Sequence, residues 1–213
     1  MPKTSLKTPL KGLYVITDPS LSNPKNIVEH VTAALEGGAK IVQFRDKTSD
    51  FATQVIMAKQ LKALCDQYQA WLIVNDSIEL AQQSQAHGIH IGKNDSDLQS
   101  ARDVLGQEAI IGVSCYNDLA LALKMQSLGA NYVAFGRFFS SSTKPNAPQA
   151  DLQTLINAKE SLSIPVVAIG GIDASNAHQL LATGVDSLAV IQGVFAQDDI
   201  QAAALQISQQ FKS

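Results

Sequence analysis

Residues 71–91 read WLIVNDSIELAQQSQAHGIHI, and this stretch contains the repeat that decides the fold. It begins with an apolar run at residues 71–75, continues with a segment of helical length at 78–85, and returns to an apolar run at 88–91. Apolar residues follow one another almost continuously in both runs, as expected of parallel strands that are buried on both faces. The stretch is therefore typical of one strand–helix–strand unit.

The same alternation recurs along the whole chain, without a long linker or a low-complexity segment. The expected strands are residues 13–17, 40–45, 71–75, 88–91, 110–114, 132–135, 165–169 and 187–191. The expected helices are residues 26–36, 51–68, 78–85, 98–105, 119–128, 152–161, 176–182 and 200–211. Eight uninterrupted units predict an α/β fold, a single-domain (β/α)8 TIM barrel over residues 13–213, with residues 1–12 as a solvated N-terminal lead-in.

An open, doubly wound sheet is the competing arrangement. It more often carries a glycine-rich fingerprint after its first strand, where this chain has Asp18-Pro19-Ser20. Four expected helices end in a glycine that is followed closely by a strand, and we expect these glycines to adopt the left-handed conformation that ends helices. These are Gly38, Gly88, Gly129 and Gly184.

Composition excludes several classes of protein. Of 213 residues, 46% are hydrophobic, and 16 Lys and Arg stand against 19 Asp and Glu, a net charge of −3 that argues against a nucleic-acid binder. No apolar run reaches the roughly 18 residues that span a bilayer, and no secretory signal is apparent. The two cysteines, Cys65 and Cys115, make no disulfide framework, so we expect a reducing, cytoplasmic compartment. Cys65 is expected to be buried, whereas a reactive role for Cys115 stays open.

Catalytic residues of such barrels lie at the carboxyl ends of the strands. After the second strand, Gln43, Arg45 and Lys47 alternate, so in an extended chain they project from the same side. Two cations at this spacing suit a phosphate or diphosphate. The alternative is a surface charge cluster in which Asp46 balances one cation.

Two carboxylates follow the next two strands. Asp76 comes directly after the third strand, although it or Ser77 can also cap the next helix. Asp95 follows the fourth strand, with Asp97 as the better helix cap. Two carboxylates that face each other across neighbouring strand ends predict a sparse Mg²⁺ site, completed by water and substrate phosphate.

The last three strands favour further phosphate binding. A long loop follows the sixth strand, and its residues 140–144 read SSSTK, with hydroxyls for phosphate oxygens and Lys144 as a point charge. Gly170-Gly171 after the seventh strand and Gln192-Gly193 after the eighth predict a phosphate site made of backbone N–H groups, although tight turns are the alternative reading.

A general base is not evident. His87 and His90 flank the fourth strand, and His90 is expected to point inward as packing. The pattern therefore favours displacement of a diphosphate, assisted by a metal, which needs positioning and charge stabilisation more than a strong base.

These motifs resemble those of the thiamine phosphate synthase family, in order and over nearly the whole chain. The matching stretches are residues 43–47 (QFRDK), 72–76 (LIVND), 88–95 (GIHIGKND), 111–114 (IGVS), 143–145 (TKP) and 166–172 (VVAIGGI). Departures from the family pattern are Asn94 before the metal aspartate, Arg137 after Gly136, and Gln192 where Ser is frequent.

The resemblance implies an enzyme of thiamine biosynthesis that joins 4-amino-5-hydroxymethyl-2-methylpyrimidine diphosphate to 4-methyl-5-(2-hydroxyethyl)thiazole phosphate. It implies that the pyrimidine diphosphate is held by Gln43, Arg45, Lys47, Asn75, Ser114 and Lys144. It implies Mg²⁺ as cofactor, on Asp76 and Asp95, and a thiazole phosphate pocket made by Ser141, Ser142, Thr143, Gly171, Ile191 and Gln192. The candidate catalytic residues are Arg45, Lys47, Ser114 and Lys144.

The expected partners are these phosphorylated small molecules, not nucleic acid or a membrane; a homo-oligomer stays open. One alternative function is the thiazole tautomerase paralogue, an isomerase that should lack the diphosphate cations and use a His after the fifth strand, where this chain has Cys115-Tyr116. Another is a non-catalytic phosphate-binding barrel, which would not need to keep Asp76 and Asp95.

Overall fold

The computed structural model describes residues 9–92, 95–140 and 149–212, and only the backbone of residues 95–97 and 212. Its strands are β1 (Gly12–Ile16), β2 (Ile41–Phe44), β3 (Trp71–Asn75), β4 (Gly88–Ile91), β5 (Ile110–Tyr116), β6 (Tyr132–Phe135), β7 (Val166–Ile169) and β8 (Ser187–Val190). Its helices are α1 (Ile27–Glu36), α2 (Phe51–Gln67), α3 (Ile78–Ser84), α4 (Asp95–Leu105), α5 (Leu119–Ser127), α6 (Leu152–Ser161), α7 (Ala177–Leu181), α8 (Gln192–Phe195) and α9 (Ile200–Gln209), followed by a 3₁₀ turn, Gln210–Lys212.

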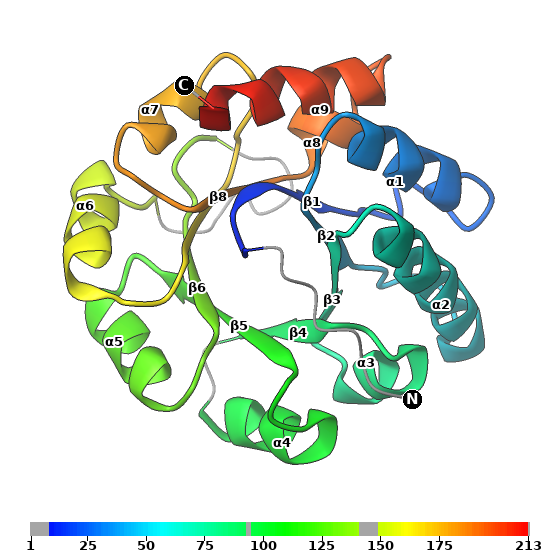
Figure 1. The fold of residues 1–213 in the computed structure, drawn as a ribbon, viewed down its shortest axis with the longest axis horizontal. Coiled ribbons are helices and arrows are strands. Elements are labelled where there is room, and N and C mark those ends of the chain that lie inside the picture. The colour runs from blue at the N-terminus through cyan, green and yellow to red at the C-terminus, as the bar shows by residue number, and fades with distance from the viewer. Residues whose placement is uncertain (1–8, 93–94, 141–148, 213) are drawn as a thin grey trace.

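The strands form a closed parallel barrel in chain order, and β8 pairs with β1 to close it. The helices surround the barrel as an outer ring (Figure 1). The predicted (β/α)8 fold is therefore confirmed. No helix in the described part of the chain is long and apolar enough to cross a membrane.

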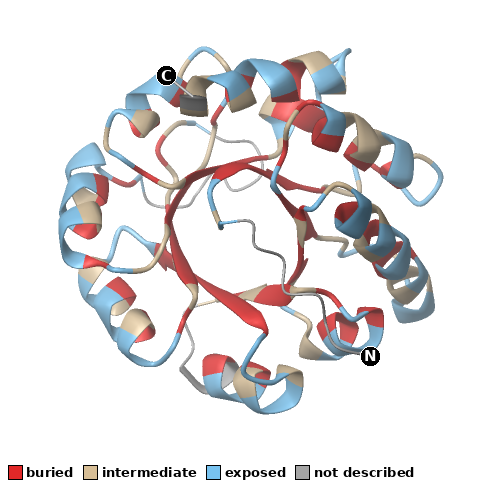
Figure 2. Cartoon of the chain, viewed as in Figure 1, coloured by how far each residue is buried: buried red, intermediate tan, exposed pale blue. Residues whose placement is uncertain are grey.

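Alternation along each strand divides the core into two layers. Side chains that point outward, such as Leu13 and Val15 of β1, pack beneath the helices, whereas Tyr14 and Ile16 belong to a separate cluster inside the barrel. The strands are accordingly buried, while each helix is buried on its inner face and exposed on its outer one (Figure 2). This inner layer forms the floor beneath the carboxyl ends of the strands.

Two local expectations were wrong. Helix α4 begins at Asp95, so Asp97 lies inside the helix and does not cap it. Gly88 is the first residue of β4 without a positive φ, and it is Gln85, with φ 54°, that ends α3 in the left-handed conformation. Gly88 is needed for space instead, because a Cβ there would lie 1.9 Å from the carbonyl oxygen of Ile110. Gly38, Gly129 and Gly184 do have positive φ, as predicted.

Candidate active site

A cavity of about 400 Å³ lies at the carboxyl ends of the strands. Every strand, or the loop that follows it, contributes to its wall. The lining residues on which the site depends are Tyr14, Gln43, Arg45, Asn75, His90, Ser114, Arg137, Gly170, Gly171, Ile191 and Gln192. The structure thus brings together in one cavity residues that lie far apart in the sequence, such as Tyr14 and Gln192.

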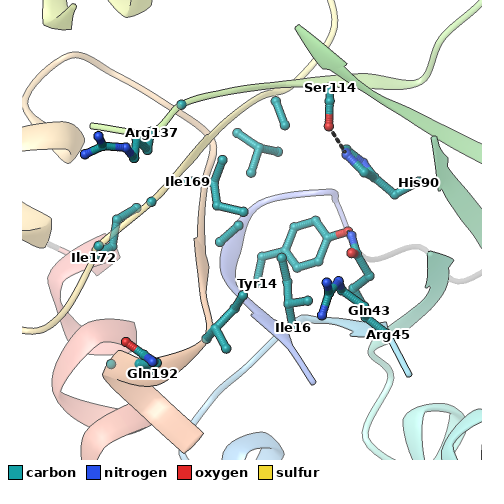
Figure 3. A pocket seen from close by; sticks show the side chains of 18 of the residues that line it. Tyr14, Ile16, Gln43, Arg45, His90, Ser114, Arg137, Ile169, Ile172 and Gln192 are labelled. Atoms are coloured by element: carbon teal, nitrogen blue, oxygen red, sulfur yellow. Dashed lines mark hydrogen bonds between the residues drawn. The ribbon is translucent and has the colours of Figure 1, made fainter. Parts of the chain in front are cut away.

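One side of the cavity carries the groups expected to hold a diphosphate. Gln43, Arg45, His90 and Ser114 lie together on that side (Figure 3). The backbone of Arg45 is held by buried Thr17, whose hydroxyl oxygen accepts from the Arg45 amide at 2.9 Å and whose proton is donated to the Arg45 carbonyl at 3.1 Å. The guanidinium of Arg45 lies 3.7 Å from Oδ2 of Asp18 at the cavity wall, where an arginine is suited to bind an anion.

Lys47 does not line this cavity with Gln43 and Arg45, as the alternation had predicted. Strand β2 ends at Phe44, and the carboxylate of Asp46 then accepts hydrogen bonds from the amides of Thr48 and Ser49 at 2.7 and 3.1 Å. These bonds turn the chain away from the extended conformation on which the prediction depended. The Lys47 ammonium instead lies 3.7 Å from Oδ2 of Asp76.

Asp76 has no capping role, because the hydroxyl of Ser77 accepts from the Leu80 amide and caps α3. Asp76 itself has a φ of 61°, which is uncommon for a residue other than glycine. The backbone amide of Asp76 donates to the His90 carbonyl at 2.9 Å, and Oδ2 of Asp76 accepts from the side-chain amide of Asn75 at 2.8 Å. The structure therefore maintains a strained backbone that holds an exposed carboxylate beside the cavity, as functional sites often do.

The oxygen donors present here suit Mg²⁺, which binds through one or two carboxylates and completes its shell with water and phosphate. Asp95, the other expected ligand, begins α4, and its side chain lies outside the described structure. Among the described residues, no group of three or more His, Cys, Asp or Glu is placed to hold a metal.

The opposite side of the cavity combines the backbone of glycines with side chains. Arg137, Ile172 and Gln192 lie there (Figure 3). A Cβ on Gly171, whose φ is 66°, would lie 2.3 Å from the Ser140 carbonyl oxygen, and a Cβ on Gly193 would lie 2.3 Å from the Ile172 carbonyl oxygen. Only glycine allows these backbone segments to pack so closely. Ile191 and Gln192 also line this side, whereas the predicted Ser141, Ser142, Thr143 and Lys144 lie outside the described residues.

Sequence reasoning missed the polar side chains at the cavity floor. His90 was expected to be inward packing, and it does point inward, but its Nε2 lies 2.9 Å from Oγ of Ser114. Tyr14, which no motif in the sequence singles out, lines the cavity and accepts a hydrogen bond from the Gln43 side-chain amide at 2.6 Å. A tyrosine at an inward position of an otherwise aliphatic strand was the available signal, since a buried hydroxyl needs a partner. Arg137, which departs from the family pattern, also lines the cavity.

Cys115 is buried and lies outside the cavity wall. Burial raises the pKa of its thiol to about 12, with a smaller contribution from Asp118. The thiol is therefore neutral near pH 7, which argues against the reactive role that the sequence left open. Cys65 is buried as expected.

Comparison with known proteins gives consistent matches. Residues 13–194 match the family model described as thiamine monophosphate synthase. The chain is 45% identical over 208 residues to the thiamine-phosphate synthase of Nitrosococcus oceani, covering 98% of this chain and 96% of that one. It is 48% identical over 207 residues to that of Alcanivorax borkumensis, covering 96% and 95%. A solved thiamine phosphate pyrophosphorylase from Pyrococcus furiosus superimposes with a TM-score of 0.86 at 36% identity, covering 94% of this chain and 95% of that one.

Proposed function

The chain belongs to the thiamine monophosphate synthase family, and from this premise we propose that it makes thiamine phosphate. The substrates are 4-amino-5-hydroxymethyl-2-methylpyrimidine diphosphate and 4-methyl-5-(2-hydroxyethyl)thiazole phosphate. The carbon–oxygen bond to the diphosphate breaks, the diphosphate leaves with the electron pair, and the thiazole nitrogen forms the new bond to the pyrimidine methylene carbon. The products are thiamine phosphate and pyrophosphate.

The observation that carries this proposal is the division of one cavity into two unlike sides. Gln43, Arg45 and Ser114 provide amide, guanidinium and hydroxyl groups on one side, which suit the polar ring and diphosphate of the first substrate. Gly171 and Gln192 belong to the opposite side, whose glycine backbone suits the smaller monophosphate of the second. A volume of about 400 Å³ is within the range of small-molecule sites.

The chain's own residues would act mainly by positioning and by charge. The Arg45 guanidinium can bind diphosphate oxygens bidentately, and Lys47, whose side chain is 60% exposed, can turn toward the same group. Charge of this kind favours the reaction most where negative charge develops on the departing diphosphate. We assign the same role to Lys144.

Asp76 and Asp95 would hold Mg²⁺. When bound, this ion neutralises negative charge on the leaving group. The exposed carboxylate of Asp76 supports the assignment, because a hydrated ion that also binds substrate phosphate requires an accessible ligand.

A two-substrate assay tests the proposal. The purified protein, both substrates and Mg²⁺ should yield thiamine phosphate and pyrophosphate in equal amounts, and Asp76→Ala should remove most of the rate. Omission of the thiazole phosphate is the control. Tautomerisation of a thiazole phosphate precursor without formation of thiamine phosphate would support the isomerase instead, and binding of phosphates without any reaction would support a non-catalytic barrel.

A further inference from the structure

A chain of hydrogen bonds crosses the inside of the barrel beneath the cavity. The Gln43 amide nitrogen lies 2.6 Å from the Tyr14 hydroxyl, which lies 2.9 Å from the Tyr132 hydroxyl. The Tyr132 hydroxyl lies 3.0 Å from Nδ1 of His90, and Nε2 of His90 lies 2.9 Å from Oγ of Ser114. The five side chains come from β2, β1, β6, β4 and β5, so the chain joins elements that are far apart in the sequence.

The number of protons available gives this chain one direction. The Gln43 amide donates to the Tyr14 oxygen, which can still accept a second bond; only if Tyr14 donates to Tyr132 do both tyrosine protons find an acceptor within this chain of hydrogen bonds. The single Tyr132 proton is then donated to Nδ1 of His90, which must be unprotonated to accept it. A neutral imidazole with an unprotonated Nδ1 carries its proton on Nε2 and donates it to Ser114.

Tyr132 is the middle side chain of this row of hydrogen bonds, and it lies below the cavity without lining it. It is 1% exposed, and its ring stacks on that of His90, with ring centres 5.5 Å apart. The barrel reserves space for it: Gly112 pairs with Tyr132 across β5 and β6, and a Cβ on Gly112 would lie 1.9 Å from Cζ of the tyrosine ring. Burial of a hydroxyl here is favourable only because both of its hydrogen bonds are made.

We propose that Tyr132 is a positioning residue, which holds Tyr14 and His90 in this single hydrogen-bond direction. At one end of the chain, Ser114 keeps its own proton to donate into the cavity. At the other end, one N–H of the Gln43 side-chain amide is donated to Tyr14, which fixes the orientation of the amide and so the position of its carbonyl acceptor beside its second N–H.

The fixed hydrogen-bond direction would also select between substrates, an inference that rests on the proposed function. A cavity with a fixed donor at Ser114 and a fixed acceptor at Gln43 matches a ring that presents an acceptor and a donor, as the ring nitrogens and amino group of a 4-aminopyrimidine do. A 4-oxopyrimidine presents a carbonyl acceptor in place of the amino donor. A site with fixed polar groups rejects the wrong partner more strongly than one whose groups can reorient.

The state of His90 can be measured without any substrate. In ¹⁵N NMR spectra of the full-length protein, His90 should show an unprotonated Nδ1 and a protonated Nε2, and Tyr132→Phe should give a mixture of tautomers. Tyr14→Phe should alter the tautomer less than Tyr132→Phe does, because Tyr132 can still donate to His90. His87 is the internal control: its Nδ1 accepts from the Leu72 amide at 2.8 Å, so its signals should not respond to either variant.

Selection is measured by the affinities of the 4-amino and 4-oxo pyrimidine diphosphates. Tyr132→Phe should reduce the preference for the amino compound about tenfold, the equivalent of roughly one hydrogen bond. Tyr68→Phe, which removes a tyrosine hydroxyl that donates to Glu36 outside the cavity, should leave the preference unchanged. In the Ser114→Ala background, Tyr132→Phe should have less than a twofold further effect, because the two residues act through the same chain.

A protonated Nδ1 on His90 in the parent protein, or a tautomer that Tyr132→Phe does not alter, would overturn the proposal. An unchanged preference for the amino ring in Tyr132→Phe would overturn its role in selection. If the tautomer responds as expected but neither pyrimidine diphosphate binds, the positioning role of Tyr132 stands and the proposed function fails.

Discussion

The ammonium of Lys47 and the carboxylate of Asp76 lie 3.7 Å apart, from loops that follow neighbouring strands β2 and β3. Lys47 was expected at the diphosphate and Asp76 at the metal, so this pair joins the two expected sites. Both side chains are more than half exposed, at 60% and 58%, so the pair itself contributes little to stability. We infer that it keeps the two groups close to where a metal-bound diphosphate would lie.

Lys47→Met should reduce kcat/KM for the pyrimidine diphosphate by about a hundredfold, because a charge that stabilises the leaving group is lost. The free energy of unfolding, measured in urea, should change by less than about 0.5 kcal/mol. Lys62→Met is the matched control, since Lys62 pairs with Asp66 at 2.6 Å on α2, away from the cavity. Equal losses of activity in the two variants would contradict the assignment of Lys47.

Asp76→Gly should abolish most of the activity without reducing stability. Glycine relieves the left-handed strain at φ 61°, and this relief stabilises the fold by roughly 1 kcal/mol. That gain offsets the destabilising effect of the entropy that glycine adds to the unfolded chain. Gln85→Gly is the control, because Gln85 has a φ of 54° but lies at the end of α3, outside the cavity wall. The Gln85→Gly protein should keep both the stability and the activity of the unmodified protein. A less stable Asp76→Gly protein would argue that this carboxylate serves the fold.

Removal of divalent metal with EDTA should stop product formation, and added Mg²⁺ should restore it. The temperature of unfolding in the absence of substrates should stay unchanged, because the described barrel closes through strand pairing and apolar burial. Turnover that persists after exhaustive chelation would refute the metal assignment.

Gly112→Ala should destabilise the protein by about 1–3 kcal/mol, because the added methyl would overlap the Tyr132 ring in a packed barrel. Gly92→Ala, where a Cβ would meet nothing within 4 Å, should change stability much less. Thermal denaturation of the two variants is the measurement. Similar behaviour of both would mean that the ring can move aside.

The two cysteines should resist alkylation by iodoacetamide at pH 8 in the folded protein and react once urea unfolds it. Burial raises the pKa of both thiols to about 12, so the reactive thiolate is scarce at any pH below that value. Mass spectrometry gives the extent of labelling. Rapid modification of Cys115 in the folded state would reopen the question of its reactivity.

The fold was predictable because it depends on short-range patterns. The apolar runs at residues 71–75 and 132–135 coincide with β3 and β6, and their lack of alternation already indicated burial on both faces. Residues 88–91 coincide with β4. Element ends were predicted less well: the start of α4 was misplaced by three residues, from 98 to 95, because several residues there could cap a helix.

Within the candidate site, sequence reasoning succeeded where a residue's place follows from the end of a strand. Gln43, Asn75 and Ser114 line the cavity for this reason. The prediction for Lys47 failed, because the hydrogen bonds that Asp46 accepts from the amides of Thr48 and Ser49 turn the backbone after β2. Such side-chain bonds are local, but whether they form depends on the conformation that the rest of the fold allows.

By itself, then, the sequence determined the order of strands and helices, the closed barrel, and the side of the barrel where polar groups gather, because each of these follows from periodicity along the chain. Only the tertiary structure decided that Tyr14 and Tyr132, from strands that do not pair with each other, meet at 2.9 Å beneath the cavity. It also decided that Lys47 lies against Asp76. Contacts of this kind depend on the closure of the barrel, which brings side chains together across its interior regardless of their separation in sequence.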